Sequence, residues 1–124
     1  MSKPKFWPGS NIAMKVPLHE YERTVSFYRD ILGLKQVEQP EPGSTESSCF
    51  KFGDKVLWID RVPEMSQAEI WLEVTTEDID LASEYLKQVG CTRRDEIEPL
   101  PEGLKGFWLS SPANIIHLIK ANSD

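Results

Sequence analysis

The sequence predicts an α+β protein in which one unit, a strand followed by a helix and three more strands, occurs twice. The first observation is an internal repeat: a strand-like run at residues 11–16 precedes a helix-like stretch ending at Leu32-Gly33, and a run at 69–74 precedes one ending at Val89-Gly90. Corresponding strand starts lie 58 residues apart, and the two glycines lie 57 apart. The second observation is length, because 124 residues suit one compact core that two half-sized units must share.

The first unit opens with an alternating strand and an amphipathic helix. Ile12, Met14 and Val16 alternate with Asn11, Ala13 and Lys15, so one face of this strand is expected in the core. After Pro17, apolar residues recur at spacings of four, three and four along one helical stripe: Tyr21, Val25, Tyr28 and Leu32. Gly33 is expected to end this helix in the left-handed conformation.

Three further strands complete the first unit. Residues 35–39 form the first of them, and Pro40, Pro42, Gly43 and Ser44 then break the chain into a loop, which is a candidate mobile flap. Ser48 to Phe52 and Lys55 to Arg61 are two alternating apolar runs joined by Gly53-Asp54. A short Gly/Asp turn between such runs predicts a hairpin.

The second unit begins with the strand at residues 69–74. Its alternation places Ile70, Leu72 and Val74 toward the core, and its other face carries Glu69, Trp71 and Glu73. A helix follows, with an apolar stripe of Ile79, Ala82, Leu86 and Val89, with Thr76 as the candidate N-cap and Gly90 as the stop. Strands are expected near residues 91–97, 105–109 and 114–120.

These elements give the boundaries of the chain's parts. They are an amino-terminal arm at residues 1–9, a first unit at 10–62, a linker at 63–68, a second unit at 69–120 and a tail at 121–124. Phe6 and Trp7 are expected to pack the arm onto the domain or onto a second chain. The linker is too short to separate two independent domains, so one compact domain is predicted.

The composition argues against a nucleic-acid or membrane partner and favours a cytoplasmic location. A formal net charge of −6 and a pI near 5.0 argue against a nucleic-acid partner, which needs clustered Lys and Arg. No apolar run is long enough for a signal peptide or a membrane span. Cys49 and Cys91 lack any motif spacing and are expected to be reduced thiols, which favours a cytoplasmic location.

Short motifs in both units resemble those of a known superfamily. They are Thr24-Val-Ser-Phe-Tyr28, Ile31-Leu-Gly-Leu34 and Ser111-Pro-Ala-Asn114 before Ile115-Ile-His-Leu-Ile119. With the repeated strand order, they resemble the vicinal oxygen chelate superfamily, which includes glyoxalase I, bleomycin-resistance proteins and extradiol dioxygenases. The resemblance implies one glyoxalase-like domain with a curved, cup-forming mixed sheet and helices outside. It also implies a small-molecule ligand and pairing of two chains in a homodimer.

The resemblance further implies where a metal would be held. The superfamily's ligand positions correspond here to Asn11, Trp58, Glu69 and His117. This is a poor metal set, because the Trp58 indole has no acceptor atom and divalent sites favour several His and carboxylate donors. No cofactor is therefore expected, although Glu69 and His117 are the two metal ligands if nickel, zinc, manganese or iron is bound. Without a metal, Glu69 and His117 are expected to pair.

The strand phases place several of these residues on the faces that point away from the helices. Trp58 and Trp71 offer wide aromatic surfaces with one polar group each, which suits a flat or cationic ligand. Core filling explains the two tryptophans equally well. Lys15, Asp60 and Glu73 alternatively face solvent or a dimer contact, since charged side chains are rarely fully buried.

Several functions remain open at this point. The first is a bleomycin-resistance-like protein that binds a cationic or aromatic small molecule without chemistry, in a cup lined by Trp58, Trp71, Glu69 and His117. Asn11, Lys15 and Glu73 are further candidate ligand-binding residues. The second is a divalent-metal-dependent lyase, isomerase or dioxygenase. A variant of this second function is a metal-free enzyme that uses Glu69 and His117 as catalytic acid and base. The third function is that of a structural or regulatory interaction module. Whether the protein is an enzyme is left open.

Overall fold

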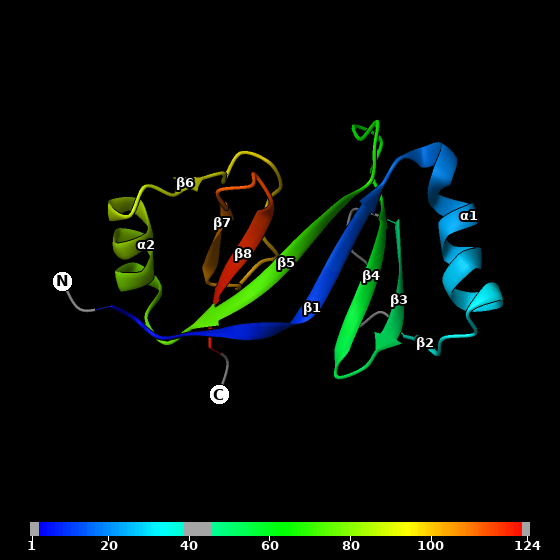
Figure 1. Ribbon diagram of the computed structural model, residues 1–124, viewed down its shortest axis with the longest axis horizontal. Helices are drawn as coiled ribbons and strands as arrows, with labels where there is room; N and C mark the ends of the chain where they lie inside the picture. Colours follow the sequence, from blue (N-terminus) through cyan, green and yellow to red (C-terminus); the bar gives the residue numbers. More distant parts are fainter. Residues whose placement is uncertain (1–2, 39–45, 123–124) are drawn as a thin grey trace. The chain divides into compact units, whose positions relative to one another are not determined.

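The computed structural model describes residues 3–38 and 46–122 (Figure 1). These residues form a mixed sheet of eight strands with helical segments, so the predicted α+β class is confirmed. The chain divides into two compact units, Ser10–Trp71 (the first unit) and Met1–Gly9 combined with Leu72–Asp124 (the second unit). The candidate flap at Pro40 to Ser44 lies outside the described residues.

The strands of the first unit pair in the order β2-β3-β4-β1. They are β1 (Phe6–Val16), β2 (Gln36–Val37), β3 (Glu46–Phe52) and β4 (Lys55–Arg61). β1 and β4 are parallel, whereas β3 is antiparallel to both β2 and β4. The predicted hairpin is confirmed, and Gly53 takes a φ of +66° at its turn. Glycine is favoured there because a Cβ would strain this left-handed conformation.

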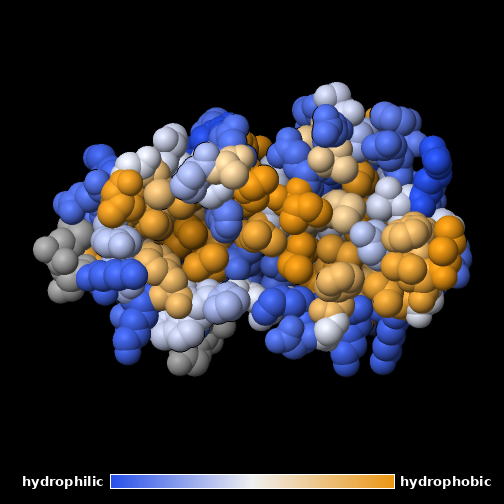
Figure 2. Space-filling model, in the orientation of Figure 1, coloured by the Kyte–Doolittle hydropathy of each residue, from blue (hydrophilic) through white to orange (hydrophobic). Residues whose placement is uncertain are grey.

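The helix of the first unit is less regular than predicted. It starts as a short 3-10 segment (η1, Leu18–Glu20), continues as α1 (Tyr21–Ser26) and ends as a π-helical segment (η2, Phe27–Ile31). Its inner side packs on one face of the sheet in a core formed by Val16, Tyr21, Val25, Phe50, Leu57 and Ile59. The wider π turn leaves Ile31 72% and Leu32 50% exposed, and Figure 2 shows an apolar patch over this end of the helix.

The strands of the second unit pair in the order β5-β8-β7-β6. They are β5 (Glu69–Thr76), whose first three residues belong to the first unit, β6 (Thr92–Arg93), β7 (Gly106–Ser110) and β8 (Ile116–Ala121), with α2 (Ile79–Gln88) following β5. β5 and β8 are parallel, and β7 is antiparallel to β6 and β8. β6 is much shorter than the strand expected at residues 91–97. The topology repeats that of the first unit, as the internal repeat predicts.

The predicted cap of α2 is wrong. Asp78 is the N-cap, and its carboxylate accepts a hydrogen bond of 3.0 Å from the Leu81 backbone N–H. Thr76 is fully buried, and its hydroxyl donates to the Lys5 carbonyl at 2.9 Å. Thr76 therefore holds the start of the chain against the second unit, while Asp78, two residues later, satisfies the helix terminus.

The first residues of β1 belong to the second unit. Phe6 packs against the core of that unit, and its ring centroid lies 6.3 Å from that of Tyr85. A Cβ on Gly9 would come within 2.4 Å of the Glu73 carboxylate, so only glycine allows this close approach. Trp7 is exposed. The expected packing of the arm onto the domain therefore involves Phe6 rather than Trp7.

The core side of β5 is only partly as predicted. Val74 packs against the second core, formed by Ala82, Phe107, Leu109 and Ile119. Ile70 and Leu72, which were also expected there, are 39% and 37% exposed. Trp71, on the opposite face, is buried instead. Among the helices that the structure describes, none combines the length and the hydropathy needed to cross a membrane.

Candidate functional site

One sheet face of the first unit carries most of the predicted site residues. Core residues such as Val16 and Ile59 point toward α1, so the residues that alternate with them point away from it. The parallel pairing of β1 with β4 sets Ala13 opposite Trp58 and Lys15 opposite Asp60. We call this face, with Asn11, Lys15, Trp58, Asp60 and the adjoining Glu69 and Trp71, the polar sheet face.

Lys15 and Asp60 form a buried ion pair on the polar sheet face. The Lys15 ammonium donates to Asp60 Oδ2 at 2.8 Å, and the Ser47 hydroxyl donates to Asp60 Oδ1. Two charges removed from water are tolerated only when they are paired and hydrogen-bonded in good geometry. The alternative that these two charged residues face solvent is therefore wrong.

Trp71 covers this ion pair. Its ring centroid lies 4.3 Å from Lys15 Nζ, which is a cation–π contact. Its indole N–H donates to Glu69 Oε1 at 3.1 Å, so the exposed Glu69 carboxylate orients the ring. The face of Trp71 that a ligand cation would use is thus already in contact with an ammonium group of the protein.

Trp58 is the more accessible tryptophan of the polar sheet face. It is half-buried, and its indole N–H donates to Asn11 Oδ1 at 2.8 Å. This hydrogen bond joins β4 to β1 and fixes the ring plane. Small neighbours flank the ring, because Ala13 is its register partner on β1 and Cys49 on β3.

Cys49 is a buried free thiol on this face, beside Trp58. Burial in an apolar environment, reinforced by the charge of Asp60, raises the pKa of the Cys49 thiol to about 11. The protonated thiol is a poor nucleophile, so Cys49 is a packing residue and not a candidate catalytic group.

The remaining predicted site residues, Glu73 and His117, belong to the second unit. Glu73 Oε2 lies 3.7 Å from Lys120 Nζ. His117 Nδ1 lies 3.0 Å from the Ile115 carbonyl oxygen, and because a carbonyl oxygen only accepts, Nδ1–H donates this hydrogen bond. Glu69 and His117 lie in different units, and their predicted pairing stays a prediction.

The donor set fits a metal ion poorly. Of the four implied positions, Asn11 Oδ1 and Glu69 Oε1 each accept a hydrogen bond from an indole N–H, Trp58 offers no acceptor atom, and only His117 adds a ring nitrogen. Within residues 3–38 and 46–122, no three His, Cys, Asp or Glu side chains are grouped so that they could hold a metal. Catalytic divalent sites normally use three such donors.

Sequence reasoning missed Ser47 as part of this face and did not select Asp60 as a site residue. The signal for Asp60 was available, because it lies two residues after Trp58 on the same strand. Ser47 had no comparable signal. Its role depends on the β3–β4 register, which places it opposite Asp60.

A family model described as "Glyoxalase-like domain" matches residues 12–114 of the chain. This stretch includes most of both repeats and the motifs at residues 24–28, 31–34 and 111–114, and it ends just before the run Ile115–Ile119. No curated protein sequence matches the chain significantly.

Solved structures share the fold at low sequence identity. A hypothetical protein, BH1468, from Bacillus halodurans C-125 is 13% identical, with a TM-score of 0.67 and coverage of 96% of both chains. Methylmalonyl-CoA epimerase from Mycobacterium tuberculosis is 11% identical, with a TM-score of 0.63 and coverage of 94% of this chain and 89% of the epimerase. Homoprotocatechuate 2,3-dioxygenase from Arthrobacter globiformis is 20% identical, with a TM-score of 0.60; 98% of this chain matches only 38% of the dioxygenase.

Proposed function

Because the chain belongs to the glyoxalase-like domain family, we propose that it binds a small, flat aromatic molecule on the polar sheet face, with Trp58 as the stacking platform. The observation that carries this proposal is the Trp58–Asn11 hydrogen bond, which holds a half-buried indole ring in one orientation on a rigid strand. A ring held in place loses little conformational freedom when a ligand stacks on it. The Asn11 amide and the Glu69 carboxylate supply polar groups beside the platform.

The contacts leave a cationic ligand less support than the sequence suggested. Trp71 is buried and its ring already contacts the Lys15 ammonium, so this second tryptophan is not available to a ligand cation. A neutral aromatic molecule needs only the Trp58 ring. The cationic half of the sequence-based hypothesis therefore has less support than the aromatic half.

The metal-dependent alternative has weaker support than binding alone. Two of its implied ligands, Asn11 and Glu69, already accept indole hydrogen bonds, and the Trp58 position has no acceptor atom, so few protein donors remain for a metal. Metal-free acid–base chemistry by Glu69 and His117 also needs both groups at one substrate. The proposed function therefore contains no chemical step.

A homodimer and a cytoplasmic location complete the proposal. The exposed apolar residues of η2 and its C-cap, Phe27, Ile31 and Leu32, support an association surface. The two free thiols Cys49 and Cys91 suit a reducing compartment. Light scattering at micromolar concentration tests the dimer directly.

The binding proposal is tested by titrating the protein with neutral quinoline and with cationic N-methylquinolinium, followed by amide and indole NMR spectra. We expect quinoline to shift the Trp58 indole signal, which is assigned by its loss in Trp58→Phe. Trp58→Leu should weaken quinoline binding by about tenfold, the size expected when aromatic stacking is removed. Trp7→Leu is the matched control, because Trp7 is an exposed tryptophan in the second unit.

Equal quinoline affinity in wild type and Trp58→Leu would refute the platform. Tighter binding of N-methylquinolinium than of quinoline would refute the preference for a neutral ligand. A metal requirement for quinoline binding, seen on adding and chelating zinc or manganese, would restore the metal-dependent alternative.

A further inference from the structure

The second unit contains a pocket that the proposed function does not use. Its volume is about 330 Å³, and it lies between the turn that follows α2 and the turn between β7 and β8. Its polar lining comes from Thr92, Arg94, Ser110, Ser111 and Asn114, and Val89 and Pro112 add apolar surface. A cavity of this size with a few polar groups is large enough for a small organic molecule.

Arg94 is the only cationic residue among those that line this pocket. Its Nε donates to Glu96 Oε2 at 2.7 Å, and its Nη1 donates to the Ser110 hydroxyl oxygen at 3.1 Å. A guanidinium has five N–H groups. Three of these N–H groups therefore have no hydrogen-bond acceptor within the described part of the chain.

The contact with Glu96 is exchangeable. The Glu96 side chain is 66% exposed, and its hydrogen bond with Arg94 lowers the pKa of the Glu96 carboxyl. Ion pairs at such exposed positions contribute little net stability. A ligand carboxylate can take the place of Glu96 at low cost, or bind beside it on the remaining N–H groups.

Two serine hydroxyls extend the donor set. Ser110 is buried and accepts from Arg94, and Ser111 Oγ accepts from the Ile115 backbone N–H at 3.2 Å. Because each hydroxyl also has one O–H to donate, both can donate to an anion. The β7–β8 turn is closed by the bond from the Asn114 N–H to the Ser111 carbonyl at 2.8 Å, so Ser111 is held in place.

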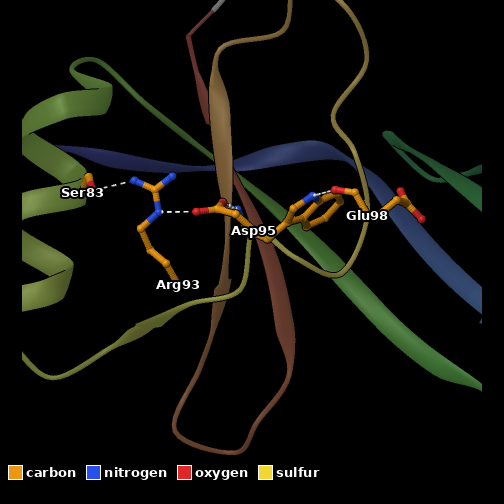
Figure 3. Close-up of polar contacts among 5 residues, drawn as sticks. Ser83, Arg93, Asp95 and Glu98 are labelled. Atoms are coloured by element: carbon orange, nitrogen blue, oxygen red, sulfur yellow. Dashed lines mark hydrogen bonds and ion pairs between the residues drawn. The ribbon is translucent and has the colours of Figure 1, made fainter.

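The neighbouring arginine has a different, structural role. Arg93 donates to Ser83 of α2 and to Asp95, and its guanidinium lies 4.5 Å from the Phe107 ring centroid (Figure 3). Asp95 in turn accepts from the Trp108 backbone N–H, and the Trp108 indole donates to the Glu98 carbonyl. Arg93 thus ties α2 to the sheet, and it does not line the pocket.

We propose that this pocket is a binding site for a small organic carboxylate, held by the Arg94 guanidinium and the hydroxyls of Ser110 and Ser111. A carboxylate matches the flat, two-pronged edge of a guanidinium. A single arginine beside an acidic residue balances one negative charge better than the two of a phosphate group. The apolar surface of Val89 and Pro112 suits the organic part of the ligand.

The test compares benzoate with benzamide, a neutral molecule of nearly the same shape, by NMR titration of the complete chain. We expect benzoate to shift amide signals of Ser110, Ser111 and Thr92, and benzamide to bind at least tenfold more weakly. Arg94→Gln should weaken benzoate binding at least tenfold, because it removes the charge-assisted hydrogen bonds. Arg93→Gln is the matched control and should leave the affinity within about twofold, as expected for a charge outside the site.

A second variant makes the test independent of any loss of folding. Glu96→Gln removes the competing carboxylate and should strengthen benzoate binding several-fold. Unchanged affinity in Arg94→Gln, equal binding of benzamide, or weaker binding in Glu96→Gln would each overturn the proposal. Tighter binding of inorganic phosphate than of benzoate would overturn the carboxylate class. Trp58→Leu should not alter benzoate binding, so this proposal and the quinoline site fail or succeed separately.

Discussion

The two units place an ion pair at corresponding positions with opposite polarity. In the first unit, Lys15 on the leading strand β1 pairs with Asp60 on β4. In the second, Glu73 on the leading strand β5 pairs with Lys120 on β8. Lys15 and Glu73 are 58 residues apart, the same spacing as the two strand starts. The repeat therefore conserves a charge-bearing position while reversing its sign.

The two pairs differ in burial and geometry. Lys15 and Asp60 are 4% and 9% exposed and 2.8 Å apart, whereas Glu73 and Lys120 are 8% and 27% exposed and 3.7 Å apart. The first pair is direct across the β1–β4 register, while the second is offset, because Lys120 stands opposite Thr75. The same position in the repeat can thus carry a positive or a negative charge if an opposite charge lies close to it. The energetic cost of losing that partner depends on how deeply the remaining charge is buried.

The largest predicted effect comes from breaking the buried pair. Lys15→Met should lower the free energy of unfolding by about 3–5 kcal/mol, because it leaves the Asp60 carboxylate buried without its counter-charge. Urea unfolding followed by tryptophan fluorescence measures this loss.

The matched control is Glu73→Gln, which breaks the second pair and leaves Lys120, whose side chain is 27% exposed. Its cost should be about 1 kcal/mol or less, because the remaining ammonium group is partly solvated. The double variant Lys15→Met/Asp60→Leu should recover most of the loss, because no unpaired charge remains. Equal costs for Lys15→Met and Glu73→Gln would contradict the comparison between the two units.

The repeated topology and most strand positions could be predicted from the sequence, because they depend on local alternation and turn residues. The β3–β4 hairpin shows this clearly, since Gly53-Asp54 alone fixes its turn. The cap of α2 was missed because Thr76, Glu77 and Asp78 all precede the helix, and only the fold shows that Thr76 bonds to Lys5.

The sequence predicts which residues share the polar sheet face, but it does not predict the contacts that these residues make with one another. Alternation places Lys15, Trp58 and Asp60 on one side of the sheet, yet the choice between solvent and burial depends on which side chains meet them. The Ser47–Asp60 and Lys15–Trp71 contacts join residues 13 and 56 positions apart. The Arg94 pocket was missed for the same reason, because it is formed where two turns of the second unit meet.

The second largest predicted effect is a loss of stability at alkaline pH, caused by Cys49 of the first unit. Burial raises the pKa of Cys49 from 9.0 to about 11, so the unfolded chain releases this thiol proton at a lower pH than the folded one. The Cys49 contribution is fully present below pH 9 and is lost as pH rises toward 11. Its size is at most roughly 2.8 kcal/mol, from two pKa units at about 1.4 kcal/mol each.

Urea unfolding at pH 7.5 and at pH 10.5 measures this effect in wild type and in Cys49→Ala. Tyr21, whose pKa burial also raises, is present in both proteins, so the difference between their slopes reports Cys49 alone. We expect the free energy of unfolding to decline less between the two pH values in Cys49→Ala than in wild type. Cys91→Ala is the control, because it leaves Cys49 in place. Identical declines in wild type and Cys49→Ala would show that the thiol does not contribute.

The smallest predicted effect on stability comes from the N-cap residues, which differ between the two helices. Asp78 caps α2 with its carboxylate, while Glu20 precedes α1 without a side-chain capping bond. Asp78→Ala should therefore cost about 1 kcal/mol, whereas Glu20→Ala should stay within about 0.5 kcal/mol of wild type. Asp78→Asn should keep most of the capping energy, since the amide oxygen can still accept from the Leu81 N–H. Urea unfolding at neutral pH measures both costs. A larger cost for Glu20→Ala than for Asp78→Ala would contradict this prediction, because it would mean that Glu20 stabilises the first helix more than the Asp78 cap stabilises α2.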